Sequence, residues 1–192
     1  MIKNQSRILY AEWLPLDKSL FCILVMLADL GEFQGNLSDV YRYLNPAVQT
    51  VQTKQRERLK EAIETLSQQG FLNYQKSGNT YHLSLVPQQQ GFKVPQGAIT
   101  ALRTHRYSSE SVAWEQVLKV YLWICRNDGK LSTNAAIAAD LNISESTVVC
   151  AKNVLKKEFN AIDVRNVSIK LDDESFLRIG QELNGSAWWE NI

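Results

Sequence analysis

The feature that most constrains this fold is a sharp corner at Asn142-Ile143-Ser144, between two segments with helical spacing of apolar residues. The spacing predicts one helix over Asn134–Leu141 and another over Glu145–Phe159. Asn142 tolerates positive φ better than most residues, so it suits a helix end that turns sharply. Ser144 is a good N-cap for the second helix. The pattern therefore predicts two helices that meet at a tight corner.

The residues around this corner resemble the helix-turn-helix signature position by position. Ala138 is the small residue required where the helices cross closely, Ile143 is the apolar plug, and Val148 points back into the core. Asn142 stands where the signature more usually has glycine, which is a mild chemical departure. The resemblance implies a DNA-binding unit. The alternative is that the unit is only a fold element, as in winged helices that bind proteins.

The N-terminal half has the same order of elements with a weaker signature. Leu59–Leu72 resembles the end of the third helix of a winged-helix domain running into its first wing strand. The predicted elements are a strand within Ile8–Leu14, helices over Lys18–Asp29, Leu37–Leu44 and Val48–Gln69, and strands Phe71–Tyr74 and Tyr81–Val86 around the turn Lys76–Asn79.

In the C-terminal half, the pattern predicts a helix before the corner, over Val112–Arg126. After the corner it predicts strands Ile162–Val164 and Val167–Leu171 and a last helix over Asp172–Leu183. The predicted fold is mainly α with small β-hairpin wings (α+β), as two winged helix-turn-helix domains in tandem. We place them at residues 1–86 and 92–192, with a linker at 87–91. This arrangement resembles plasmid and phage replication-initiation proteins and their primosome relatives. Tandem winged helices also occur in transcription regulators and chromosome-condensation accessory proteins.

The charge of the chain is nearly balanced, with 21 basic and 20 acidic residues. Its distribution is uneven, because residues 166–192 are acidic and the segment before them is mildly basic. Three cysteines far apart indicate no disulfide framework or zinc spacing. The run Leu20–Ala28 is too short to span a bilayer, and no secretory signal is visible. We therefore expect a cytoplasmic protein without a membrane partner.

The helix that follows the corner, Glu145–Phe159, is expected to present a polar face to DNA. At 100° per residue, its apolar residues share one face and the others point away. Asn153 is suited to pair with adenine, Val149 to meet a thymine methyl group, and Lys156 and Lys157 to neutralise phosphates. The predicted DNA-binding residues here are Ser144, Ser146, Thr147, Val149, Asn153, Lys156 and Lys157.

The N-terminal half offers a second basic helix. Lys54–Lys60 holds four basic residues and one acid, the densest positive stretch in the chain. We expect Val48, Leu59, Ile63 and Leu66 on the core face of this helix. The predicted DNA-binding residues are Thr50, Thr53, Lys54, Arg56 and Lys60, with Lys76 at the wing tip. The alternative is an ordinary solvated helix.

The sequence contains no recognisable set of catalytic or metal-binding residues. It has two isolated histidines and no glycine-rich phosphate loop after a strand. We therefore expect no catalytic residue, metal or cofactor. Trp188 and Trp189 either dock on their own domain or face a partner, which would be a second copy of the chain or a replication or transcription protein. The expected function is double-stranded DNA binding in replication initiation, its control, or transcription regulation. The alternative is a protein-interaction scaffold without DNA.

Overall fold

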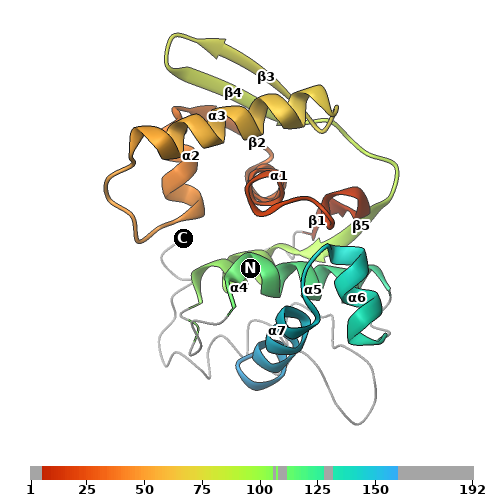
Figure 1. Ribbon diagram of the computed structural model, residues 1–192. Coiled ribbons are helices and arrows are strands. Elements are labelled where there is room, and N and C mark those ends of the chain that lie inside the picture. Colours follow the sequence, from red (N-terminus) through yellow and green to blue (C-terminus); the bar gives the residue numbers. More distant parts are fainter. Residues whose placement is uncertain (1–5, 106, 108–111, 128–131, 160–192) are drawn as a thin grey trace, which may run out of the picture. The chain divides into compact units, whose positions relative to one another are not determined.

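The computed structural model describes residues 6–105, 107, 112–127 and 132–159. The chain divides into two compact units, Ile8–Gly91 and Met1–Arg7 with Phe92–Ile192, which we call the N-terminal and C-terminal units. The fold is α+β. The described residues form seven α-helices, one short 3-10 helix and five strands, three of which make an antiparallel sheet (Figure 1).

The N-terminal unit interleaves three helices with a three-stranded sheet. Its sheet has the order β2-β4-β3, and Phe33 and Tyr74 both lie opposite Leu83 of the central strand. The elements are β1 (Ser6–Tyr10), which begins in the other unit, the 3-10 helix η1 (Ala11–Trp13), α1 (Lys18–Leu30), β2 (Glu32–Gly35), α2 (Leu37–Leu44), α3 (Thr53–Gln68), β3 (Leu72–Ser77) and β4 (Thr80–Leu85).

Helix α1 is the centre of this unit. Every residue from Leu20 to Asp29 is buried, and α1 packs against α2, α3, β2 and β4. A helix that is apolar on all sides is stable only when other elements surround it. The side chain of Asp17 caps the helix by accepting a hydrogen bond of 3.1 Å from the Leu20 N–H. The helix ends one residue beyond the predicted Asp29.

The turn from β2 into α2 is closely packed. A Cβ on Gly35 would lie 2.7 Å from Cζ of Phe33, so the backbone approaches that ring more closely than any side chain allows. Asn36 then caps α2, and its Oδ1 accepts hydrogen bonds from the N–H groups of Ser38 and Asp39. Asp39 Oδ2 accepts from the Asn36 N–H at 3.0 Å, which completes a capping box.

The C-terminal unit is built around α5 (Trp114–Arg126), which packs against α4, α6 and α7. Its residues Val117–Leu118 and Val120–Ile124 are buried apolar positions. Trp123 donates a hydrogen bond of 2.9 Å from Nε1 to Asp140 and so joins α5 to α6. The other elements are β5 (Gly91–Pro95), α4 (Gln96–Thr104), α6 (Asn134–Leu141) and α7 (Glu145–Lys157).

Several predicted boundaries are wrong. Helix α3 begins at Thr53 rather than Val48, because Gln52 is extended (φ −73°, ψ 155°) and residues 48–52 form no buried face. Helix α5 begins at Trp114 rather than Val112, and α7 ends at Lys157 rather than Phe159. The predicted strand at Ile8–Leu14 gives way to the 3-10 helix after Tyr10.

Sequence reasoning missed the four-residue strand β2 and the nine-residue helix α4. Strand β5 begins at Gly91, which was placed in the linker. Strand β2 alternates exposed and half-buried residues over too short a length to give a period. The predicted second hairpin, the helix over Asp172–Leu183, and Trp188 and Trp189 lie outside the described residues.

Candidate nucleic-acid interface

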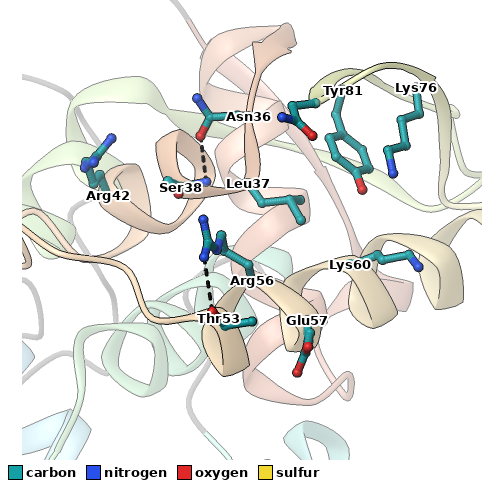
Figure 2. Close-up of a pocket in the computed structure, with 11 residues that line it drawn as sticks. Asn36, Leu37, Ser38, Arg42, Thr53, Arg56, Glu57, Lys60, Lys76 and Tyr81 are labelled. Carbon is teal, nitrogen blue, oxygen red and sulfur yellow. Dashed lines mark hydrogen bonds between the residues drawn. The ribbon is translucent and has the colours of Figure 1, made fainter.

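A groove of about 560 Å³ opens on the N-terminal unit. It lies between the beginning of α2, one flank of α3 and the β3–β4 hairpin (Figure 2). Four of its eleven lining residues are basic and one is acidic. The lining residues are Asn36, Leu37, Ser38, Arg42, Thr53, Arg56, Glu57, Lys60, Lys76, Asn79 and Tyr81. The groove therefore concentrates positive charge that the balanced total of the chain does not reveal.

Arg56 is held in place by a neutral partner. One of its terminal nitrogens, Nη2, donates a hydrogen bond of 3.2 Å to the hydroxyl oxygen of Thr53, one turn earlier on α3. No ion pair joins Arg56 to any acid within the described ranges. A guanidinium with unused donors is well suited to bind a phosphate through two hydrogen bonds.

Lys76 brings a second charge from the hairpin. It lies opposite Tyr81 in the register of β3 and β4, and its Nζ is 5.6 Å from the centre of the Tyr81 ring. The ring of Tyr74 stacks on the other tyrosine at 6.4 Å. Gly78 has φ of 59° at the hairpin turn, a conformation that glycine adopts without strain. The aromatic pair thus supports a cation near the hairpin tip.

The remaining two basic residues of the groove have acidic neighbours. Arg42 lies 3.3 Å from Asp39, and Lys60 lies 3.7 Å from Glu64. The side chains of both pairs are at least 39% exposed, so water screens the attraction. Such pairs contribute little to stability. Both cations can therefore exchange these partners for a phosphate at little cost.

The C-terminal unit presents a second polar surface along α7. Val148, Ala151, Val154 and Leu155 form its buried face. The predicted contact residues Ser144, Ser146, Val149, Asn153, Lys156 and Lys157 are exposed, and Thr147 is half-buried. Val149 keeps 41% of its surface exposed.

The corner between α6 and α7 has the predicted geometry. Asn142 has φ of 53° and ψ of 48°, and it is the only non-glycine residue of the described chain with positive φ. Ser144 caps α7, with its Oγ accepting a hydrogen bond of 3.1 Å from the Thr147 N–H. Oγ of Ser146 and Oγ1 of Thr147 each lie 2.8 Å from Oγ of Ser144. This hydroxyl cluster fixes the beginning of α7.

Lys152 is the α7 lysine that does not serve the exposed face. Its Nζ donates hydrogen bonds to Oδ1 of Asn134 at 2.8 Å and to the Ser132 carbonyl at 3.4 Å. Partial burial lowers the pKa of this amine. Lys152 therefore links α7 to the beginning of α6. At the other end of α7, Oε2 of Glu158 lies 2.6 Å from Nε2 of His105, just after α4.

The groove brings together four of the predicted N-terminal residues, namely Thr53, Arg56, Lys60 and Lys76. Lys54 is exposed on α3 but does not line the groove. The expected helical position of Thr50 is wrong, because the residue lies before the first turn of α3.

Sequence reasoning missed the contribution of α2 to the groove, which consists of Asn36, Leu37, Ser38 and Arg42. The signal for Arg42 was its place beside Asp39 on the polar side of a short amphipathic helix.

The described residues contain no group of three or more His, Cys, Asp or Glu side chains able to hold a metal ion. Burial raises the pKa of the Cys125 thiol to about 12, so this sulfur is not a nucleophile near neutral pH. No helix in the described part is both long and apolar enough to cross a bilayer.

Comparison of the chain with protein-family models, with curated proteins and with solved structures gives no match.

Proposed function

We propose that this protein binds double-stranded DNA through two winged helix-turn-helix domains. The observation that carries the proposal is the groove, where Arg42, Arg56, Lys60 and Lys76 gather from three separate elements. Phosphate contacts supply most of the affinity of DNA-binding proteins, and they require basic side chains arranged along one surface.

The order of elements in the N-terminal unit supports a winged helix. Three helices alternate with strands as α1, β2, α2, α3, β3 and β4, and the hairpin that follows α3 is the wing. In such domains the third helix and the wing lie on the DNA-binding side, and both line the groove here. The C-terminal unit contributes the helix-turn-helix corner at Asn142, with α7 as the helix offered to bases.

The resemblance of the tandem arrangement to replication-initiation proteins favours a role in replication initiation or its control. Transcription regulation is the next choice, because repressors and activators use the same units. Both roles require a cytoplasmic protein that meets chromosomal or plasmid DNA.

A scaffold that binds proteins instead of DNA is the second candidate. The observation that favours it is the stripe of three acids, Glu57, Glu61 and Glu64, on the outer side of α3. Acidic side chains on the expected recognition helix repel phosphates. A near-neutral total charge points the same way.

Fluorescence anisotropy with a random-sequence duplex at two salt concentrations separates the two candidates. We expect binding at low salt that weakens steeply as salt rises, because bound lysines and arginines release counterions. Replacing Arg56 by Ala weakens binding, whereas the matched control Arg58→Ala, an exposed arginine of the same helix outside the groove, does not. A folded protein that does not bind at low salt would favour the scaffold.

A further inference from the structure

The outer side of α3 carries negative charge. Leu59, Ala62, Ile63 and Leu66 form its buried face. Glu57, Glu61 and Glu64 follow one another at spacings of four and three residues, so they form a stripe on the side opposite Ile63. This acidic stripe extends over about 10 Å of helix. Glu57 and Glu61 are exposed, and the side chain of Glu64 is 39% exposed.

The positive charge of α3 lies on a different flank. Arg56 and Lys60 line the groove with Lys76 of the hairpin. Figure 2 shows Arg56 directed from α3 toward the beginning of α2, while Glu57 leaves the helix in another direction. The groove and the acidic stripe adjoin at Glu57, which lines the groove, whereas Glu61 and Glu64 lie outside the groove.

The two acids outside the groove, Glu61 and Glu64, have a consequence for how DNA can approach. A helix inserted lengthwise into the major groove places its outermost side chains between two rows of phosphates. The acidic stripe would then lie within one Debye length, about 8 Å, of several negative charges. A phosphate row in the groove would instead lie beside Arg56 and Lys76, and neither of these residues has an acidic partner in the described ranges.

We infer that the N-terminal unit grips one phosphate backbone of duplex DNA in this groove and keeps α3 out of the major groove. This inference rests on the proposed function and specifies its ligand. The recognised chemistry is a row of phosphodiesters, independent of base sequence. Base reading is then left to α7, whose outer side carries Val149 and Asn153 and a single acid, Glu145, at its first position.

The groove can neutralise two to four phosphates. Arg56 and Lys76 can bind a phosphate without giving up a carboxylate partner. Arg42 and Lys60 must first exchange their exposed carboxylate partners for phosphate. Polar groups that line the groove, on Ser38 and Asn79, can donate further hydrogen bonds to phosphate oxygens. Each neutralised phosphate contributes about −0.9 to the slope of log affinity against log salt.

The test uses the full chain with Asn153, Lys156 and Lys157 of α7 replaced by Ala, so that the remaining affinity reports on the N-terminal groove. Two fluorescent duplexes of one random sequence serve as probes. One is unmodified, and in the other the cytosines carry glucosylated 5-hydroxymethyl groups that fill the major groove. We expect the dissociation constants for the two duplexes to agree within about twofold, because contacts to the phosphate backbone do not depend on what fills the major groove.

A loss of affinity of about tenfold or more on the filled duplex would overturn the inference, since insertion of α3 requires an open major groove. So would an α7 variant that no longer binds the unmodified duplex while the unsubstituted chain still does. If the unsubstituted chain binds neither duplex, the proposed function itself fails, and the two failures are thereby distinguished.

Added to the α7 variant, Arg56→Ala reduces affinity for both duplexes equally and makes the salt slope shallower by about 1. Arg58→Ala, from the side of α3 away from the groove, leaves both affinities within about twofold. An Arg56→Ala effect confined to the unmodified duplex would contradict a sequence-independent grip.

Discussion

The side-chain amide of Gln55 donates a hydrogen bond of 2.8 Å from Nε2 to the phenolic oxygen of Tyr41, which joins the first turn of α3 to α2. The other end of the same amide, Oε1, accepts from the N–H of Gln52 at 2.8 Å. One side chain therefore both begins α3 and sets its distance from α2. Because these two helices form two walls of the groove, this contact also shapes the groove.

Replacing Tyr41 by Phe removes the acceptor and leaves a partly buried amide donor without its partner. We expect the free energy of unfolding to fall by about 1 kcal/mol. Urea denaturation of Tyr41→Phe, Gln55→Ala and the double variant measures the coupling between the two residues. If the two single losses simply add, the hydrogen bond contributes nothing to stability.

The hydroxyl cluster at the beginning of α7 predicts unequal roles for two adjacent serines. Ser144 accepts from a backbone N–H and Ser146 does not. We expect Ser144→Ala to lower the free energy of unfolding by about 1 kcal/mol. Ser146→Ala, the matched control, should stay within about 0.5 kcal/mol of the unsubstituted protein. Equal losses in urea denaturation would show that the cap does not stabilise α7.

The half-buried thiol of Cys125 predicts a loss of stability at high pH. Its pKa is raised from 9.0 to about 12, chiefly by burial, so folding favours the neutral thiol. The stabilisation is complete below pH 9 and is lost as pH rises from 9 toward 12, by at most about 1.4 kcal/mol per pH unit. Between pH 9 and 11, Cys125→Ala should lose less stability than the unsubstituted protein in urea denaturation. Parallel losses would contradict a raised pKa of this thiol.

The exposed side of α7 predicts two kinds of DNA-binding defect. Replacing Lys156 and Lys157 by Ala should weaken binding to every sequence and reduce the salt slope by about 2. Replacing Asn153 by Ala should instead change the preference between sequences, because its amide can pair with a base edge. Selection of preferred sites from a random duplex pool, followed by anisotropy, measures both effects. A uniform loss from Asn153→Ala would argue against base reading.

The elements predicted best from sequence are those whose ends depend on neighbouring residues. Helix α6 spans the predicted residues, and α7 begins where predicted, because the left-handed Asn142 and the Ser144 cap act locally. Helix α3 begins five residues after its predicted start at Val48, because no sequence signal marks Gln52 as extended. Strand β2 owes its existence to β4, about 50 residues later, and four residues show no period of their own.

The groove was only partly predictable for the same reason. Helical spacing placed Arg56 and Lys60 on the flank of α3, and turn chemistry placed Lys76 at a hairpin. That these residues meet Arg42 across the groove depends on tertiary packing that periodicity does not encode. Positive charge from three elements becomes a site only when α2, α3 and the hairpin assemble around α1.

The enclosure of α1 limits how this protein can be dissected. Ten consecutive residues, Leu20 to Asp29, are buried, and α1 packs against α2, α3, β2 and β4, which all follow it in the sequence. A truncation that removed α3 or the hairpin would leave this rod uncovered in water, and the fragment would aggregate. During synthesis, the ribosome releases α1 well before β4 emerges. A nascent chain stalled at that stage is the form most in need of a chaperone.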